Sequence, residues 1–137
     1  MIWFRPYTTG QLSLSGLAQH LGMEFTEIGP DFLRGRMPVN EHTRQPYGIL
    51  HGGASVALAE TLGSTGASMV LDPDKYQCVG QEINANHVRA VTDGFVIGTA
   101  RPVHIGRRSQ VWEIRIADEQ DRLVCISRIT MFVIARN

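Results

Sequence analysis

Residues 51–71 read HGGASVALAETLGSTGASMVL, and Glu60 is the only charged side chain between His51 and Leu71. The other residues are mostly Ala, Ser, Gly and Leu, which leave no polar face wide enough for a surface helix. The stretch therefore predicts a helix from His51 to about Val70 that is covered on nearly all sides. A carboxylate is rarely buried without a partner, and unpartnered burial raises the pKa of a carboxylate. Glu60 is accordingly the first candidate for a general base or nucleophile.

The segments on either side of this helix predict a sheet. Residues 23–28 and 32–39 alternate apolar with polar side chains around Gly29-Pro30-Asp31, which is typical of a hairpin. A short amphipathic helix is predicted over residues 9–21, although Gly16 weakens its pattern. Four strand-like runs follow the long helix, with a turn predicted at 118–121: residues 77–90, 94–104, 110–117 and 122–134.

The order of these elements indicates an α+β fold. Consecutive strand runs joined by short turns favour antiparallel pairing, and one long central helix needs a curved sheet to wrap it. Residues 1–137 are expected to form a single domain, because no repeat, low-complexity stretch or linker divides them. One sheet of this size cannot cover a helix that is apolar all round. We therefore expect a second copy of the chain to cover the rest.

Composition excludes several classes of function. Thirteen basic residues balance thirteen acidic residues, so no overall field attracts nucleic acid or an anionic membrane. The first residues contain neither a long apolar core nor a small-residue cleavage site, so we expect a cytoplasmic protein without a signal peptide or membrane anchor. Cys78 and Cys125 each lie in an apolar run and are predicted to be buried free thiols.

The start of the long helix suggests acyl-transfer chemistry. Gly52 and Gly53 could present free backbone N–H groups to a developing oxyanion, while Glu60 attacks the carbonyl or activates water. Gly52 and Glu60 lie about 12 Å apart along a helix axis, so they cannot touch one carbonyl. His51 and Glu60 also differ by about 180° around the helix. A shared site must therefore combine the helix start of one subunit with Glu60 of another, as two antiparallel helices about a two-fold axis would.

Further candidates carry weaker signals. Ser64 follows Glu60 by four positions, so its hydroxyl could hold a water beside the carboxylate or simply pack. His87, in the run EINANHVRA, could line the pocket or be structural. A group of basic residues could hold the phosphates of a nucleotide-bearing substrate or form a solvated strand end: Arg101, His104, Arg107 and Arg108, with Arg89 nearby in sequence.

The runs QPYGILHGGASVALAETLGS and EINANHVRA together resemble the hotdog-fold thioesterases. The narrower resemblance is to the hydroxybenzoyl-CoA-type branch, which includes the dihydroxynaphthoyl-CoA thioesterase of menaquinone biosynthesis and the proofreading thioesterase of enterobactin biosynthesis. It extends from MIW, through MPV and TRQP, to RPVHIGRRSQVWEI and the final strands. The resemblance implies a long helix wrapped by a curved antiparallel sheet, dimers paired edge to edge, and two dimers in a tetramer.

The same resemblance implies roles for individual residues. Gln45 and the Gly52 amide would polarise the thioester carbonyl, His51 would position the thioester, and Glu60 of the partner chain would be nucleophile or general base. Ser64 and His87 would hold the hydrolytic water or the acyl group. Contacts with coenzyme A would come from Gly80, His87, Val88, Arg89, Ala90, His104, Ile105, Gly106, Arg107, Arg108 and Ser109.

We therefore expect hydrolysis of an acyl- or aroyl-CoA, with no metal and with coenzyme A present only as part of the substrate. The spacing of HGG and the glutamate favours this reaction. Three alternatives remain: a hydratase or dehydratase acting on enoyl-CoA, a proofreading thioesterase acting on an acyl or aryl carrier protein, and a non-catalytic acyl-CoA sensor. Thr65 and Ser68 stand where close relatives often carry apolar or small residues, which leaves the acyl preference open.

Overall fold

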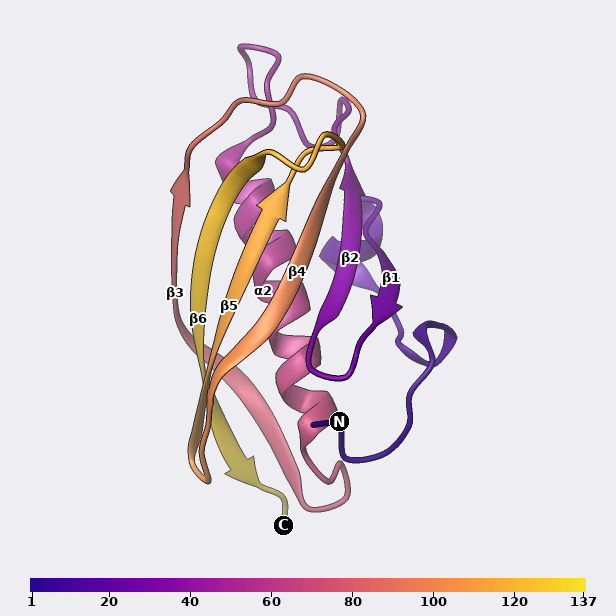
Figure 1. Cartoon of the computed structure of the whole chain (residues 1–137), viewed down its shortest axis with the longest axis vertical. Helices are drawn as coiled ribbons and strands as arrows, with labels where there is room; N and C mark the ends of the chain where they lie inside the picture. The colour runs from indigo at the N-terminus through magenta and orange to yellow at the C-terminus, as the bar shows by residue number, and fades with distance from the viewer.

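Helix α2 (Gly52–Val70) lies against the concave side of a curved six-stranded sheet in the computed structural model, which describes residues 1–137 (Figure 1). Every neighbouring pair of strands is antiparallel. The α+β prediction and the curved sheet around one long helix are confirmed. The strands are β1 (Glu24–Ile28), β2 (Leu33–Pro38), β3 (Tyr76–His87), β4 (Phe95–Ile105), β5 (Ser109–Ala117) and β6 (Leu123–Ala135).

The small residues of α2 let the helix approach the sheet closely. A Cβ atom added at Gly63 would lie 2.6 Å from Ile129 Cγ2, and one at Gly66 would lie 2.9 Å from the Trp112 ring. Leu58 and Leu62 are fully buried in this contact. Burial of a leucine side chain contributes about 1.5–3 kcal/mol, so this face of α2 is a main source of stability.

The strand order β1-β2-β4-β5-β6-β3 differs in one place from simple pairing of consecutive runs. Strand β3 pairs with β6 instead of β4, so β1 and β3 form the two edges of the sheet. The chain between β3 and β4 is not a tight turn: the Val88 N–H donates to Val124 O at 2.8 Å, and the Leu50 N–H donates to Val91 O at 2.8 Å. This connection brings residues 88–94 to the N-terminal end of α2.

The predicted helix over residues 9–21 is wrong in extent. The structure has a 3₁₀ turn, η1 (Thr9–Gln11), and a short helix, α1 (Gly16–His20), separated by non-helical residues. Gly16 adopts a φ of +59°, a left-handed conformation that breaks a continuous helix. The turn at 118–121 is confirmed, with Asp121 at a φ of 60°.

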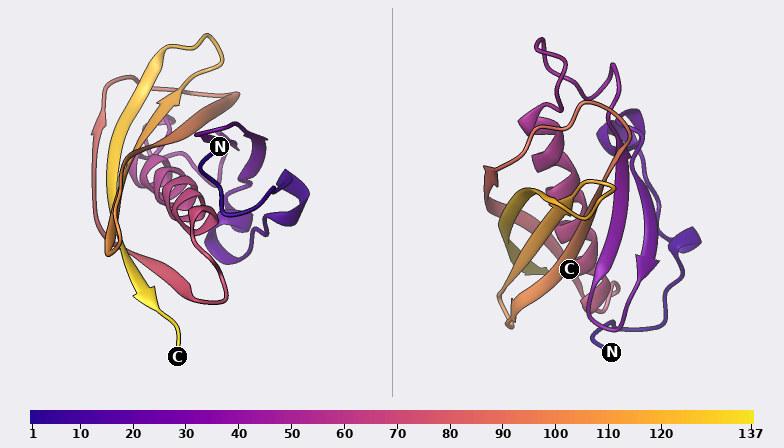
Figure 2. Two further views of the ribbon diagram at one scale, coloured as in Figure 1. Left: turned by 60° about the horizontal axis from the view of Figure 1, so that its bottom comes forward. Right: turned by 45° about the horizontal axis from the view of Figure 1, so that its top comes forward.

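The sheet covers only one side of α2. The N-terminal residues lie on the opposite side of the helix, as the left view of Figure 2 shows. Glu60 and Ser68 remain exposed in the single chain, as one sheet cannot enclose the helix. Cys125 is buried and Cys78 half-buried, and both are free thiols. None of the helices has the length and apolar character needed to cross a membrane.

Candidate active site

The N-terminal end of α2 presents a free backbone donor. His51 is the N-cap residue, and its Nδ1 accepts a hydrogen bond of 2.8 Å from the Gly53 N–H. The Gly52 N–H donates to no group of the protein. Because the first N–H groups of a helix carry its partial positive charge, the Gly52 amide is suited to an oxygen that gains negative charge.

Gln45 and His87 face this donor across a cavity of about 230 Å³, which Gln45, Gly52, His87 and Arg89 line. The Gln45 side-chain oxygen accepts a hydrogen bond from the Tyr47 N–H. This contact fixes the amide group and leaves its NH₂ to donate. The helix-start cavity therefore contains two neutral donors, the Gln45 amide and the Gly52 N–H.

His87 lies directly over Gly52 of its own chain. A Cβ atom at position 52 would be 2.9 Å from His87 Nε2, so only glycine leaves room for the imidazole. This placement follows from β3, whose last residue, His87, pairs with Cys125 of β6. Within one chain His87 therefore lies with the helix-start group and lines a different cavity from Ser64.

Glu60 lies further along α2 and is exposed, so the expectation that it is buried is wrong for the single chain. The carboxylate lies against Gly80 of β3, because a Cβ atom there would be 2.7 Å from Glu60 Oε2. Glu60 forms no ion pair within the chain. The carboxylate is thus free to meet a substrate or a water.

Ser64 shares a hollow with Glu60, as their spacing predicts. The hollow has a volume of about 400 Å³ and lies between α2 and residues 13–18. The Ser64 hydroxyl donates to Met131 Sδ at 3.7 Å, and a thioether sulfur is only a weak acceptor. None of the residues that line this hollow also lines the helix-start cavity.

The residues that the resemblance assigns to coenzyme A lie at two levels of the sheet. Gly80 pairs with Met131, which pairs with Gln110 next to the β4–β5 turn, whereas His87 pairs with Cys125. Six residues of β6 separate these levels, or about 20 Å. The group at the level of Glu60 consists of Gly80 and the turn residues His104, Ile105, Gly106, Arg107, Arg108 and Ser109; the group beside Gly52 consists of His87, Val88, Arg89 and Ala90.

The predicted basic group is not one cluster. Arg101 lies on the convex face of the sheet, where its Nη1 donates to Asp31 at 3.2 Å. Arg89 lies at the helix-start cavity, at the other end of the sheet from Arg107 and Arg108. Arg107 and Arg108 form no ion pair, so they retain free charge for an anionic ligand.

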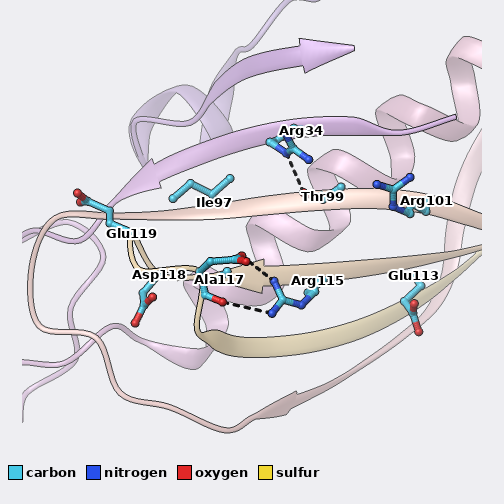
Figure 3. Close-up of a pocket in the computed structure, with 10 residues that line it drawn as sticks. Arg34, Ile97, Thr99, Arg101, Glu113, Arg115, Ala117, Asp118 and Glu119 are labelled. Atoms are coloured by element: carbon cyan, nitrogen blue, oxygen red, sulfur yellow. Dashed lines mark hydrogen bonds and ion pairs between the residues drawn. The ribbon is translucent and has the colours of Figure 1, made fainter. Parts of the chain in front are cut away.

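The convex face also carries a hollow of about 540 Å³, in which Arg101 is the one predicted candidate residue (Figure 3). Its arginines are paired with acidic groups: Arg34 with Glu27 at 2.5 Å, and Arg115 with Asp121 at 3.2 Å. Sequence analysis did not reveal this hollow, because its residues come from three strands and a turn that only the sheet pairing brings together. The mutual neutralisation of its charges makes it a poor candidate for binding an anion.

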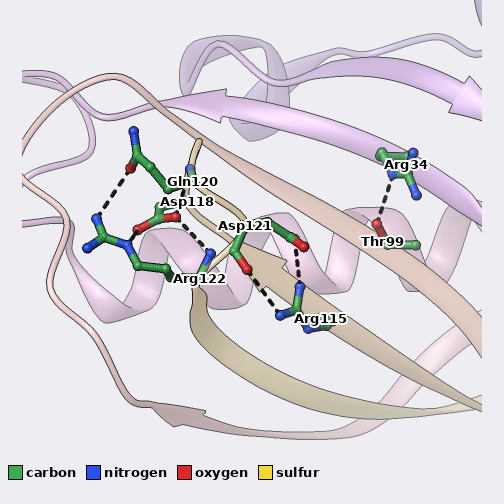
Figure 4. A network of polar contacts seen from close by, with 7 residues as sticks. All are labelled: Arg34, Thr99, Arg115, Asp118, Gln120, Asp121 and Arg122. Carbon is green, nitrogen blue, oxygen red and sulfur yellow. Dashed lines mark hydrogen bonds and ion pairs between the residues drawn. The ribbon is translucent and has the colours of Figure 1, made fainter.

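Asp118 anchors the neighbouring polar network (Figure 4). Burial would raise the pKa of this carboxyl, but hydrogen bonds from the Arg122 and Gln120 backbone and from the Arg122 guanidinium outweigh it and lower the pKa. The Arg122 Nε donates to Asp118 Oδ2 at 2.7 Å. The ionised carboxylate thus stabilises the β5–β6 turn.

One part of the site was missed by sequence analysis. Ser13, Leu14 and Leu17 of the N-terminal segment line the hollow that contains Glu60. The available signal was weak, because this segment forms no regular element between Leu12 and Ser15. The one signal that this segment packs against the protein is a short alternation: Leu12 and Leu14 are half-buried and Ser13 between them is exposed.

Comparison with known proteins agrees with this geometry. Residues 47–125 match the thioesterase superfamily. The chain is 51% identical over 136 residues to the proofreading thioesterase EntH of Cronobacter turicensis, covering 97% of this chain and 98% of the relative. It is 45% identical over 137 residues to the 1,4-dihydroxy-2-naphthoyl-CoA hydrolase of Escherichia coli K12, covering 98% of this chain and all of the relative.

Two solved structures have the same fold. A thioesterase from Haemophilus influenzae superposes with a TM-score of 0.94 at 44% identity, covering 98% of this chain and 96% of that one. A mutant thioesterase from Pseudomonas aeruginosa superposes with a TM-score of 0.97 at 39% identity, covering 99% and 100%. The chain therefore belongs to the thioesterase superfamily and is a thioester hydrolase of the hotdog fold.

Proposed function

We propose that the protein hydrolyses an aroyl- or acyl-CoA in a site that two copies of the chain build together. One copy contributes Gln45 and the Gly52 N–H, and the other contributes Glu60. The observation that carries this proposal is the unpaired Gly52 N–H at the helix start, beside the fixed Gln45 amide in a small cavity. Such donors stabilise the oxyanion of an acyl-transfer transition state.

The proposed reaction adds water to the thioester and releases a carboxylic acid and a thiol. The carbonyl oxygen accepts hydrogen bonds from Gly52 and Gln45 while charge develops on it. Glu60 then acts in one of two ways: it attacks the carbonyl carbon and forms an anhydride that water cleaves, or it removes a proton from the attacking water. Neither route requires a metal or a resident cofactor.

The need for two copies is supported by the separation of the two groups. Gly52 and Glu60 lie eight residues apart on one straight helix, about 12 Å along its axis, and they line different cavities. The exposure of Glu60 leaves its face available to a partner. Strand β3 lies at an edge of the sheet with most of its residues exposed, so edge-to-edge pairing of two β3 strands is the proposed contact. Association of two such dimers into a tetramer is part of the proposal.

The proposed substrate is a hydroxylated aroyl thioester of coenzyme A, because the chain is similar over nearly its whole length to a relative that is named for 1,4-dihydroxy-2-naphthoyl-CoA. A role in menaquinone biosynthesis follows only if that substrate is the natural one. Arg107 and Arg108 have free charge for the nucleotide phosphates.

The deciding experiment is thiol release from benzoyl-CoA by the purified protein and by Glu60→Ala. We expect turnover by the wild type and loss of most of it in the variant, with binding of the substrate retained. Glu113→Gln is the matched control, since it removes an exposed carboxylate from the convex face. A fully active Glu60→Ala protein would refute the mechanism. Consumption of the double bond of an enoyl-CoA without thiol release would indicate a hydratase instead.

A further inference from the structure

Ser55 is a buried serine whose hydroxyl has no hydrogen-bond partner inside the chain. Five polar or charged residues are buried, and the side chains of four of them form hydrogen bonds: Thr43, Gln110, Asp118 and Ser127. Ser55 is the fifth, and it is 1% exposed. A buried hydroxyl without a partner costs stability, so packing alone does not explain a serine at this position.

The Ser55 hydroxyl opens into the helix-start cavity. Ser55 lines this cavity of about 230 Å³ together with Gln45, Gly52 and His87. Arg36 Nε is the one side-chain nitrogen or oxygen that is fully enclosed without a partner. The Ser55 hydroxyl is therefore not sealed within the core, and the small surface that it exposes faces the cavity. Its hydrogen-bonding capacity is available to a molecule in that cavity.

The His87 imidazole also lacks a partner within the chain. It takes part in no hydrogen bond and no ion pair. The end of β3, which carries His87, lies beside the start of α2 (Figure 1). The Nε2 atom faces the helix, since it would lie 2.9 Å from a Cβ atom at position 52. One nitrogen of a neutral imidazole donates and the other accepts, so a fixed partner at Nε2 would select one form and one orientation of the ring.

The spacing of Ser55 and His87 suits one bridging water. Cβ atoms three residues apart on a helix are about 5–6 Å apart, which is the distance from Ser55 Cβ to the position of a Cβ at residue 52. His87 Nε2 lies 2.9 Å from that position. A water that bonds to two groups at about 2.8 Å spans about 4.5–5.5 Å between them. The cavity has room for it, because a water occupies about 30 Å³ in the liquid.

We infer that Ser55 is a positioning residue of the reaction: its hydroxyl holds one water that bonds to His87 Nε2 and fixes the orientation of the imidazole. The inference rests on the proposed function, in which the helix-start cavity receives the thioester carbonyl. Because His87 lies over Gly52, a fixed ring presents one defined hydrogen-bonding group beside the reacting carbonyl. Ser55 therefore acts through His87 and not on the thioester itself.

Ser55→Ala removes the hydroxyl without removing any hydrogen bond within the chain. We expect kcat for benzoyl-CoA to fall about tenfold while KM changes by less than about twofold, because positioning acts on the transition state and not on substrate binding. The melting temperature should not fall by more than about 1 °C, because no protein partner is lost. An unchanged kcat would show that the serine only packs.

The matched control is Ser127→Ala, which alters a second buried serine. The Ser127 hydroxyl donates to Asn84 O at 2.8 Å, so this variant loses a hydrogen bond of the fold. We expect its melting temperature to fall by about 4 °C and its kcat to stay within about twofold of wild type. The two serine variants should thus show opposite patterns: Ser55→Ala loses activity, and Ser127→Ala loses stability.

Two substitutions at the same position separate the hydroxyl from the volume of the side chain. Ser55→Cys keeps a similar size but offers only a weak S–H donor, so its kcat should stay near that of Ser55→Ala. Ser55→Thr keeps a hydroxyl, and its kcat should lie within about threefold of wild type. A Ser55→Cys protein as active as the wild type would contradict the inference.

A double-mutant cycle tests whether Ser55 acts through the imidazole. In a His87→Ala background the group that Ser55 positions is gone, so adding Ser55→Ala should lower kcat by less than about twofold. The same tenfold loss in both backgrounds would overturn the inference, because Ser55 would then act independently of His87.

The outcomes distinguish this inference from the proposed function. Thiol release that depends on Glu60 and is unchanged in Ser55→Ala would overturn the inference and leave the function standing. A wild-type protein that releases no thiol from benzoyl-CoA would overturn the proposed function and the inference with it. If Ser55→Ala does not fold, Ser55→Cys replaces it in the kinetic test and in the cycle with His87→Ala.

Discussion

The helix-start cavity and the hollow that contains Glu60 lie along the same helix but are built differently. In the first, hydrogen bonds within the chain fix the reacting groups: Gly53 to His51, and Tyr47 to Gln45. In the second, Glu60 has no ion-pair partner and lines an open hollow between α2 and residues 13–18. The reacting groups of the first region are therefore held within the single chain, whereas the Glu60 carboxylate of the second is free to meet a further group.

The largest expected effect concerns the open region. Glu60→Gln keeps the size of the side chain but removes its charge and its capacity to act as base or nucleophile. We expect kcat to fall about 10³-fold. The measurement is thiol release at saturating benzoyl-CoA. Because Glu60 is exposed, the melting temperature should stay close to that of the wild type. A drop in both quantities would mean that the residue is structural.

A smaller effect is expected in the fixed region. Gln45→Ala removes one of two oxyanion donors and leaves the Gly52 N–H in place, so kcat should fall about 10²-fold. The control is Gln19→Ala, an exposed glutamine on α1. A change in KM alone would contradict the assignment, because a group that acts on the transition state must alter kcat.

Mixed oligomers test directly whether the two regions act across subunits. Co-expression of Glu60→Ala and Gln45→Ala chains should restore about one quarter of wild-type activity, because half of the dimers are mixed and each mixed dimer has one intact site. Each variant expressed alone should stay at about one hundredth of wild-type activity or below. If a single chain contained the whole site, the mixture would show no recovery.

The smallest expected effect lies outside both regions, in the Asp118 turn. Because the pKa of Asp118 is lowered in the folded protein, its ionised form stabilises the fold above the ordinary carboxyl pKa of about 3.9. This contribution is lost as the pH falls through the lower folded value. Asp118→Asn should therefore reduce the free energy of unfolding at pH 7, and the difference from wild type should shrink below about pH 4. Urea unfolding at several pH values measures it; a gap that is constant with pH would contradict the assignment.

The sequence predicted the helix and the strands closely because each has a local signature. The small and apolar run after His51 marks α2, and alternation marks the strands to within about three residues. The helix over residues 9–21 failed because Gly16 takes a left-handed conformation that periodicity does not reveal. Sequence spacing also predicted that Gly52 and Glu60 would lie apart, since helix geometry alone determines it.

Long-range placement was less predictable. Arg101 appears beside Arg107 and Arg108 along the chain, but strand pairing brings it to Asp31, seventy residues away. Glu60 was expected to be buried from the composition of its helix, yet only the shape of the sheet decides which helix face stays open. The N-terminal residues that line the hollow beside Glu60 belong to a segment without periodicity. No sequence pattern therefore predicted their position.

Residues 5–15 of the N-terminal segment have a consequence for how the protein tolerates substitution. They contribute no backbone hydrogen bond to the sheet or to α2. Substitutions in this segment therefore leave the backbone of the helix start and of Glu60 where they are. The amino terminus can vary in sequence while the elements that carry the two cavities stay in place.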